Sequence, residues 1–331
     1  MGDSIGTVHA PDVQSQRPNV AIGLSRVGVT GVEKVIRIRH AGTEQLFSAR
    51  IECFIDLGPD QKGAHMSRFE EVVNEAIGEV ILGESGFRAE QLAQRIAELV
   101  RSRQNSLRAE VTIAARYPEH RPAPVSGINT QEIYTLFGVA AASQRGTRRV
   151  VGVAAQGMTA CPCAQELVAA DARRRLEEDG FSDAEVERIF AAVPVATHNQ
   201  RGLGTLHVGV TEDEPLEIDA ATLLRIVEGS MSSEIYELMK RSDEAAVVAR
   251  AHARPRFVED CVREMIGGVI AQLPQLPDEA FVSARQENLE TIHQHNVLAE
   301  REGTLGELRR ELGSGEHALA HTAMREWLQG S

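Results

Sequence analysis

Residues 45–57, QLFSARIECFIDL, decide the fold class because apolar and polar residues alternate along them. Alternation of this kind is typical of a β-strand that buries one face. Residues 19–39, rich in glycine and β-branched residues, predict another strand just before it. Two amphipathic helical patterns follow, over 67–83 and 88–103. The order strand–strand–helix–helix indicates an α+β protein with antiparallel sheets.

The same order of elements occurs twice along the chain, as a repeat of pattern without a repeat of residues. The sequence therefore predicts two tandem ββααββ units, each with an antiparallel sheet and helices on one face. Such sheets leave unpaired edges, which favours a homo-oligomer that joins the sheets edge to edge. The remaining expected strands cover 106–117, 130–143, 147–160, 204–212, 279–291 and 292–302, and the second pair of helices covers 219–232 and 255–273.

The predicted domain organisation follows from this repeat. We expect an N-terminal unit over 19–145 and a C-terminal unit over 146–305. A charged, strongly helical insertion over about 166–194 interrupts the second unit. A flexible leader, 1–18, and a C-terminal helical extension, 306–331, complete the chain.

Composition excludes several classes of protein. Of the 331 residues, 42% are hydrophobic and 25% charged, which is ordinary for a globular protein. No apolar run approaches the ~18 residues of a membrane span, and the N-terminus lacks the features of a secretory signal. A net charge of −13 argues against nucleic acid as a partner. Only four cysteines, widely scattered, indicate a reduced, cytoplasmic protein.

Two of those cysteines flank a proline in GMTACPCAQ, residues 157–165. Cys161 and Cys163 are open to three interpretations. They can be small buried side chains beneath a turn, or they can supply a thiolate ligand for a metal ion. A redox pair is disfavoured, because the spacing is one residue short of CxxC. Pro162 stiffens the turn, so only one sulfur is expected to face a site.

Three further polar clusters, each taken alone, are most simply interpreted as surface residues without a functional role. His198 lies in ATHNQRG, residues 196–202, just before a strand. Residues 238–247 resemble a solvated helix face on which Glu244 helps to cap the helix. Residues 287–297 carry three polar side chains on a predicted strand, Glu290, His293 and His295. Together with the cysteines, these clusters fit a catalytic divalent-metal site with a position left for water.

The chain resembles the alternative, B-type GTP cyclohydrolase I enzymes, which have the tunnelling fold. Ordered motifs from about residue 20 to 300 carry this resemblance. The family's members assemble as homotetramers with sites at subunit interfaces, and their substrate is GTP. The motifs are KGAHMSRFEE, SGINTQEIY, GMTACPCAQE, THNQRG, YELMKRSDEAAV, PRFVEDCVRE and ENLETIHQHN.

The resemblance implies roles for particular residues. One divalent ion per site, Zn²⁺, Fe²⁺ or Mn²⁺, would be held by Cys161, His198, Glu244 and His293. Glu259 would anchor the purine. The resemblance places Glu290 beside the metal for proton transfer, with His295 as a second proton shuttle. The triphosphate needs cations, for which Arg201 and Lys240 are candidates, together with Lys34 and Arg241.

The implied activity is that of a hydrolase on a cyclic amidine, at the first step of folate and pterin biosynthesis. The guanine imidazole ring opens at C8 with release of formate. The product is 7,8-dihydroneopterin triphosphate or its 2′,3′-cyclic phosphate. The long helical stretch between Cys161 and His198 departs from some bacterial relatives and occurs in archaeal-type ones, which leaves both product forms open.

Two other functions stay possible at this stage. One is a tunnelling-fold purine- or pterin-binding protein whose zinc is structural. The other is a deazapurine nitrile reductase, in which a cysteine is a covalent nucleophile and no metal is needed. Metal analysis of the purified protein separates the second from a metal-dependent hydrolase.

Overall fold

The computed structural model describes residues 12–40, 43–80, 88–214, 218–315 and 320–330. The chain forms two compact units. The first comprises residues 1–113 and 139–147, and the second comprises 114–138 and 148–331. Most of the predicted leader, residues 1–11, lies outside the described residues. The predicted domain boundaries after residues 145 and 305 stay predictions.

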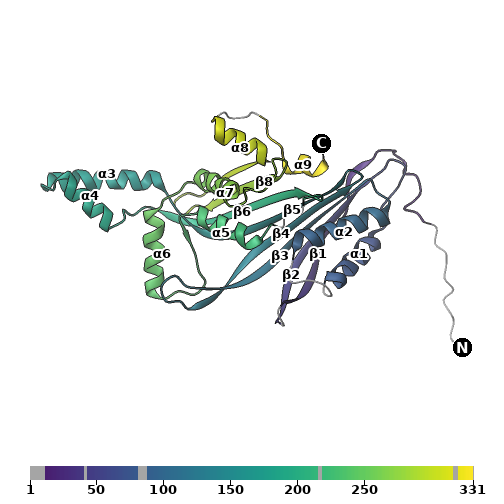
Figure 1. Cartoon of the computed structure of the whole chain (residues 1–331), viewed down its shortest axis with the longest axis horizontal. Coiled ribbons are helices and arrows are strands. Elements are labelled where there is room, and N and C mark those ends of the chain that lie inside the picture. Colours follow the sequence, from purple (N-terminus) through teal and green to yellow (C-terminus); the bar gives the residue numbers. More distant parts are fainter. Residues whose placement is uncertain (1–11, 41–42, 81–87, 215–217, 316–319, 331) are drawn as a thin grey trace. The chain divides into compact units, whose positions relative to one another are not determined.

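The first unit begins with a long antiparallel hairpin of β1 (Leu24–His40) and β2 (Thr43–Leu57). Two helices follow, α1 (Met66–Val80) and α2 (Ala89–Gln104), which pack against each other and against the hairpin (Figure 1). The alternation that predicted β2 corresponds to burial, because every second residue is at most 2% exposed. These residues are Phe47, Ala49, Ile51, Cys53 and Ile55.

Strands β3 (Arg108–Pro122) and β4 (Asn129–Ser143) contribute residues to both units. Residues 108–113 of β3 and 139–143 of β4 belong to the first unit, where Ala109, Val111 and Ile113 are fully buried. Residues 114–138, which include the turn between the two strands, belong to the second unit. The predicted strands at 106–117 and 130–143 are therefore confirmed, although β3 extends five residues further than expected.

The second unit is built on four antiparallel strands that neighbour one another in the order β5, β6, β8, β9. Helices α5 and α7 pack against each other and against these strands. A two-residue strand, β7, pairs with the end of β5. The bounds are β5 (Gly146–Ala160), β6 (Asn199–Thr211), β7 (Ser233–Glu234), β8 (Phe281–Leu289), β9 (Val297–Thr304), α5 (Ala220–Ser230) and α7 (Val258–Gln272).

The predicted helical insertion forms a hairpin of α3 (Pro162–Glu178) and α4 (Asp183–Ala192) between β5 and β6 (Figure 1). A capping box starts α4, where the backbone N–H of Ser182 donates to Glu185 over 2.8 Å. Helix α3 buries none of its residues, so the hairpin adds little to the core. Another helix, α6 (Arg241–Ala253), precedes α7.

Glycine is required where β5 and β6 run close to buried side chains. Gly157 pairs with Gly202 in the ladder, near the ends of both strands. A Cβ atom at Gly157 would lie 2.7 Å from Sδ of Met231, and one at Gly202 would collide with the Gln286 amide. Met231 and Gln286 are fully buried, so a side chain at either glycine would require these buried side chains to repack.

The C-terminal extension forms α8 (Leu305–Ser314) and α9 (Met324–Gln329). Trp327 of α9 is only 4% exposed and fills the space above Gly209 of β6. Its ring lies 5.5 Å from the Phe281 ring between centroids, and its Nε1–H donates to the Glu279 carbonyl over 2.9 Å. The extension therefore seals one end of the second unit's sheet. None of the helices in the described ranges is both long and apolar enough to cross a membrane.

We expect Trp327→Ala to lower the free energy of unfolding by about 3–5 kcal/mol, because it removes a large buried side chain. Trp327→Phe keeps most of the apolar volume and loses the hydrogen bond to Glu279. Its free energy of unfolding should therefore fall less than that of Trp327→Ala. Urea unfolding followed by circular dichroism measures both. Equal losses for the two variants would contradict the packing role.

Candidate functional site

The end of the β5–β6 ladder brings Cys161 and His198 together. Cys161 directly follows β5 and His198 directly precedes β6, and the last ladder pair is Ala160 with Asn199. The ladder continues one step further, because the backbone N–H of Cys161 donates to the His198 carbonyl over 3.1 Å. The Thr197 hydroxyl donates to the Cys161 carbonyl over 2.8 Å. Strand pairing thus brings together two residues that the helical insertion separates in sequence.

Cys161 and Cys163 differ in their surroundings, as the stiff turn at Pro162 predicts. Cys161 is half-buried and is the N-cap of α3, with Pro162 at the first helical position. Cys163 lies in the first turn of α3 and is exposed. Both thiols are free. Of the two, Cys161 is the one next to the histidine.

The His198 imidazole has two oxygen atoms near Nδ1. The amide Oε1 of Gln200 lies 3.2 Å from this nitrogen, and the Oε2 of Glu290 lies 3.9 Å from it. The Glu290 side chain is 6% exposed, and this Oε2 atom has no hydrogen-bond partner. A buried carboxylate oxygen without a donor is costly, so such an atom marks a place where a ligand or an ion is expected.

His293 and His295 lie on a loop, not on the predicted strand. The β8–β9 ladder ends at the pair Asn288–Val297, so the residues between them form the connection. The expectation of a strand starting at residue 292 was wrong, because β9 begins only at Val297. Both imidazoles are exposed and stack with centroids 5.1 Å apart.

Glu244 lies exposed in the first turn of α6, and its buried neighbour Asp243 forms the cap. Asp243 Oδ2 accepts from the Lys240 backbone over 2.8 Å, and Oδ1 accepts from the backbones of Val125 and Ser126, each over 2.8 Å. The Ser126 hydroxyl also donates, over 2.7 Å. Burial alone would raise the pKa of Asp243, but these hydrogen bonds outweigh it and hold the pKa well below its ordinary value.

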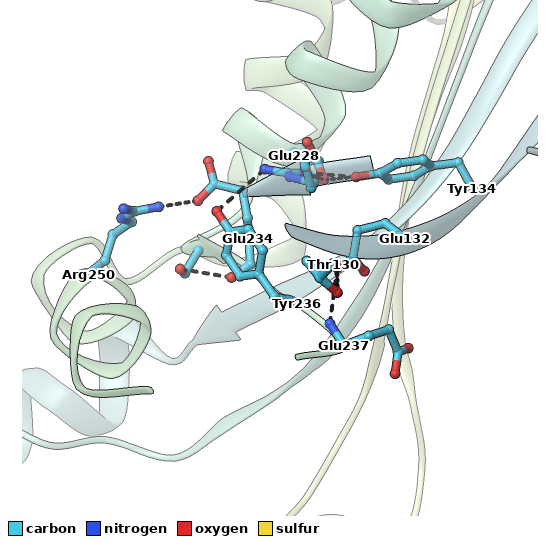
Figure 2. Close-up of polar contacts among 10 residues, drawn as sticks. Thr130, Glu132, Tyr134, Glu228, Glu234, Tyr236, Glu237 and Arg250 are labelled. Atoms are coloured by element: carbon cyan, nitrogen blue, oxygen red, sulfur yellow. Dashed lines mark hydrogen bonds and ion pairs between the residues drawn. The ribbon is translucent and has the colours of Figure 1, made fainter. Parts of the chain in front are cut away.

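A cleft of about 380 Å³ opens beside Asn199 and Gln200, the two residues that directly follow His198. Arg201 projects into it from β6, and Thr291 closes it from the connection after β8. Glu132 of β4 lies on its wall, where its Oε1 accepts from the Glu237 backbone over 3.0 Å (Figure 2). The full lining is Glu132, Gln156, Gly157, Met158, Asn199, Gln200, Arg201, Ile235, Tyr236, Glu237, Met239 and Thr291.

A buried ionic network stands behind this wall (Figure 2). Arg121 donates to the Tyr134 hydroxyl over 2.7 Å and to Glu228 over 2.5 Å, and Tyr134 donates to Glu228 over 2.8 Å. Burial raises the pKa of Glu228 against the opposing effect of Arg121. The Arg121 guanidinium also lies over the Tyr236 ring, 4.9 Å from its centroid. The network therefore fixes the segment that carries Tyr236 into the cleft.

Sequence reasoning did not find this network or Asp243. Arg121, Tyr134 and Glu228 come from distant segments, and nothing local marks them as partners. For Asp243, the position itself was a signal, because an acidic residue three places after a helix N-cap often caps the backbone.

Glu259 and Lys240 do not line the cleft that contains Arg201. Glu259 is exposed in the first turn of α7, at a second groove of about 630 Å³ between α7, α8 and β9. The two clefts share no lining residue. Lys240 is exposed at the start of α6. Lys34 belongs to the first unit and donates to Glu70 over 2.8 Å.

The predicted metal ligands are assembled only in part. Within the described ranges, no group of three or more His, Cys, Asp or Glu side chains is close enough to hold a metal ion. The thiol, the imidazole and the unpartnered Glu290 carboxylate nevertheless have the donor chemistry of a zinc or iron site. His293 and Glu244 lie on exposed segments.

Solved structures place the chain in a fold class. It matches the uricase from Arthrobacter globiformis with a TM-score of 0.51 at 10% identity, covering 94% of this chain and 99% of that one. A thermostable variant of this uricase gives the same TM-score at 9% identity, covering 94% and 98%. Uricases have the tunnelling fold, so the α+β tunnelling fold predicted from the sequence is confirmed.

The sequence itself places the chain in a family. Residues 10–299 match the family described as type I GTP cyclohydrolase folE2. GTP cyclohydrolase MptA of Methanosarcina acetivorans is 40% identical over 316 residues, covering 92% of this chain and 98% of the relative. The same enzyme of Methanococcus aeolicus is 40% identical over 307 residues, covering 91% and 99%. The chain therefore belongs to the type I GTP cyclohydrolase family, and the predicted enzyme class is confirmed.

We expect Asp243→Asn to lower the Tm of the metal-free protein by several degrees at neutral pH, because it removes a charged cap. The folded-state pKa of Asp243 lies below its unfolded value. Its contribution is therefore complete above about pH 4 and is lost as the pH falls further.

The measurement is Tm against pH for the wild type, Asp243→Asn and the exposed control Glu244→Gln. The difference in Tm between the wild type and Asp243→Asn should shrink as the pH falls below about 4. The Tm of Glu244→Gln should follow that of the wild type at every pH. A gap that stays constant down to low pH would show that the charge of Asp243 does not matter.

Proposed function

We propose that the chain opens the guanine imidazole ring of GTP by hydrolysis at C8 and releases formate. Recyclisation then gives 7,8-dihydroneopterin triphosphate or, when a side-chain hydroxyl displaces diphosphate from the α-phosphorus, 7,8-dihydroneopterin 2′,3′-cyclic phosphate. The observation that carries this proposal is that the β5–β6 ladder joins Cys161 to His198, whose imidazole lies 3.9 Å from the unpartnered Glu290 carboxylate. Membership of the type I GTP cyclohydrolase family supplies the substrate class.

Cys161 and His198 would hold one divalent ion together with His293 and Glu244. When bound, Zn²⁺, Fe²⁺ or Mn²⁺ supplies Lewis-acid chemistry and makes hydroxide available near neutral pH. The backbone hydrogen bond between Cys161 and His198 supports the assignment, since it holds two candidate ligands at neighbouring positions. His293 lies on the same loop as Glu290, whose carboxylate is 3.9 Å from the His198 ring, which supports His293 as a third ligand.

Glu290 suits proton transfer during ring opening. Opening the imidazole ring requires protons at ring nitrogens, and a buried carboxylate without a donor is able to take one up and release it. His295 is exposed on the adjoining loop and would exchange that proton with solvent. The cleft beside Gln200 carries Arg201, whose guanidinium suits a phosphate group.

Glu259 would anchor the purine. Its carboxylate is able to accept two parallel hydrogen bonds, from N1–H and from the 2-amino group of guanine, which adenine does not offer. Glu259 and Arg201 line different clefts. We therefore propose that each active site takes Glu259 from one copy of the chain and Arg201 from a neighbouring copy. A homotetramer with sites at subunit interfaces satisfies this arrangement, with Lys240 as a further cation for the triphosphate.

Incubation of the full chain with GTP and Zn²⁺, Mn²⁺ or Fe²⁺ should yield a pterin that fluoresces after oxidation. Cys161→Ala should abolish this product while circular dichroism and oligomeric state stay unchanged, because a catalytic ligand is lost and the core is not. The product mass distinguishes the triphosphate from the cyclic phosphate. Full activity without metal would contradict the proposal, and unfolding of Cys161→Ala would indicate a structural zinc instead.

For Glu259→Gln we expect a loss of GTP turnover of about 10²-fold or more with unchanged metal content. An amide offers only one acceptor atom to the two guanine donors, so a buried donor is left unmatched. Asp260→Asn is the matched control, because Asp260 neighbours Glu259 on α7 but is bound to the Phe257 backbone over 3.0 Å. If Glu259→Gln turned over GTP as fast as the wild type, the assignment of Glu259 as the purine anchor would be wrong.

A further inference from the structure

Gln200 contacts the imidazole that the proposed function makes a metal ligand. It lies on β6, two residues after His198, and is 6% exposed. Its Oε1 is 3.2 Å from Nδ1 of His198. An amide oxygen only accepts hydrogen bonds. For this contact to be a hydrogen bond, the Nδ1 atom must carry the proton.

Glu290 favours the same form of the ring. Its Oε2 lies 3.9 Å from the same Nδ1, within ion-pair range, and has no hydrogen-bond partner. A carboxylate is acceptor-only and negatively charged, so it also stabilises a proton on Nδ1. Two independent oxygen atoms, from β6 and from the residue after β8, therefore select one tautomer.

This tautomer decides which ring nitrogen of His198 is able to bind a metal ion. With Nδ1 protonated, Nε2 keeps its lone pair and is the only ring atom able to bind a metal ion. Imidazole in water favours the opposite tautomer, with the proton on Nε2. Without an acceptor at Nδ1, His198 would thus spend most of its time in the form in which Nε2 cannot coordinate.

The choice of glutamine follows from where the side chain lies. Gln200 pairs with Thr159 in the ladder, and both residues are buried. A neutral amide offers the acceptor there without the desolvation cost of a second buried carboxylate beside Glu290. Pairing with β5 holds the Gln200 backbone, and the ladder between β6 and β8 starts at the next residue, Arg201.

We propose that Gln200 is a positioning residue that sets the Nδ1–H tautomer of His198 and presents Nε2 to the metal ion. This inference rests on the proposed function only for the identity of the metal ligand. The tautomer itself is a property of the metal-free chain.

The first test is ¹⁵N NMR of histidine-labelled, metal-free full-length protein, with the His198 signals identified by their loss in His198→Gln. The wild type and Gln200→Glu, which keeps an acceptor oxygen, should show His198 protonated on Nδ1. Gln200→Met has nearly the same shape but no acceptor, and should shift His198 toward the Nε2–H form. Gln156→Met changes an exposed glutamine of the same cleft and should leave His198 unchanged.

The second test is the Zn²⁺ affinity of the same proteins, measured by competition with a chelator. Gln200→Met should bind Zn²⁺ about 10–100-fold more weakly, the usual effect of losing a group that orients a ligand. Gln156→Met should bind as the wild type does, and Gln200→Glu should bind more tightly than Gln200→Met because it keeps an acceptor at Nδ1.

The outcomes separate the two proposals. A wild-type His198 protonated on Nε2 would overturn the inference, even if Gln200→Met failed to fold. The inference is also overturned if Gln200→Met leaves both the tautomer and the affinity unchanged while His198→Gln weakens binding. If His198→Gln binds Zn²⁺ as the wild type does, the ligand assignment in the proposed function is wrong instead.

Discussion

One backbone hydrogen bond, from Cys161 to the carbonyl of His198, organises the site. It extends the β5–β6 ladder by one step beyond the last strand residues, at the point where a long insertion leaves and rejoins the sheet. The bond fixes the backbone positions of Cys161 and His198 relative to each other, whatever the rotamers of their side chains. Every other feature of the site depends on that fixed pair, including the contacts of Gln200 and Glu290 with the imidazole.

The surrounding structure supports this pair from several sides. Gln165 of α3 donates to the carbonyls of Val195 and His252, over 2.6 and 2.7 Å. The Arg256 backbone donates to the Ala160 carbonyl over 3.0 Å. The start of α3, the end of α6 and the segment before α7 are thereby tied to the ends of β5 and β6. Rigid support of this kind is what a site with a fixed donor geometry requires.

The sequence predicted the parts of the molecule that depend on local pattern. Alternation along residues 45–57 identified β2 because that strand buries one face, and the motifs around Cys161 and His198 identified the family. Local pattern was misleading at residues 292–296, where histidines before an alternating strand resemble a continuation of it. Pairing with β8, which the pattern does not contain, decides where β9 begins. The same reason hid the contact between Arg121 and Glu228, since two charges far apart in sequence give no local sign of being neighbours.

The α3–α4 hairpin is attached to the sheet at two points that the sheet itself holds together. Its outer turn contains Gly180 in a left-handed conformation, with φ of +93° and open space around it. Forces or added mass at that turn reach the β5–β6 junction through α3, which buries none of its residues, and α4, which buries only Val186. The hairpin tip is accordingly a suitable graft point, where a reporter domain or an affinity handle could be inserted while the two chain ends at the sheet keep their spacing.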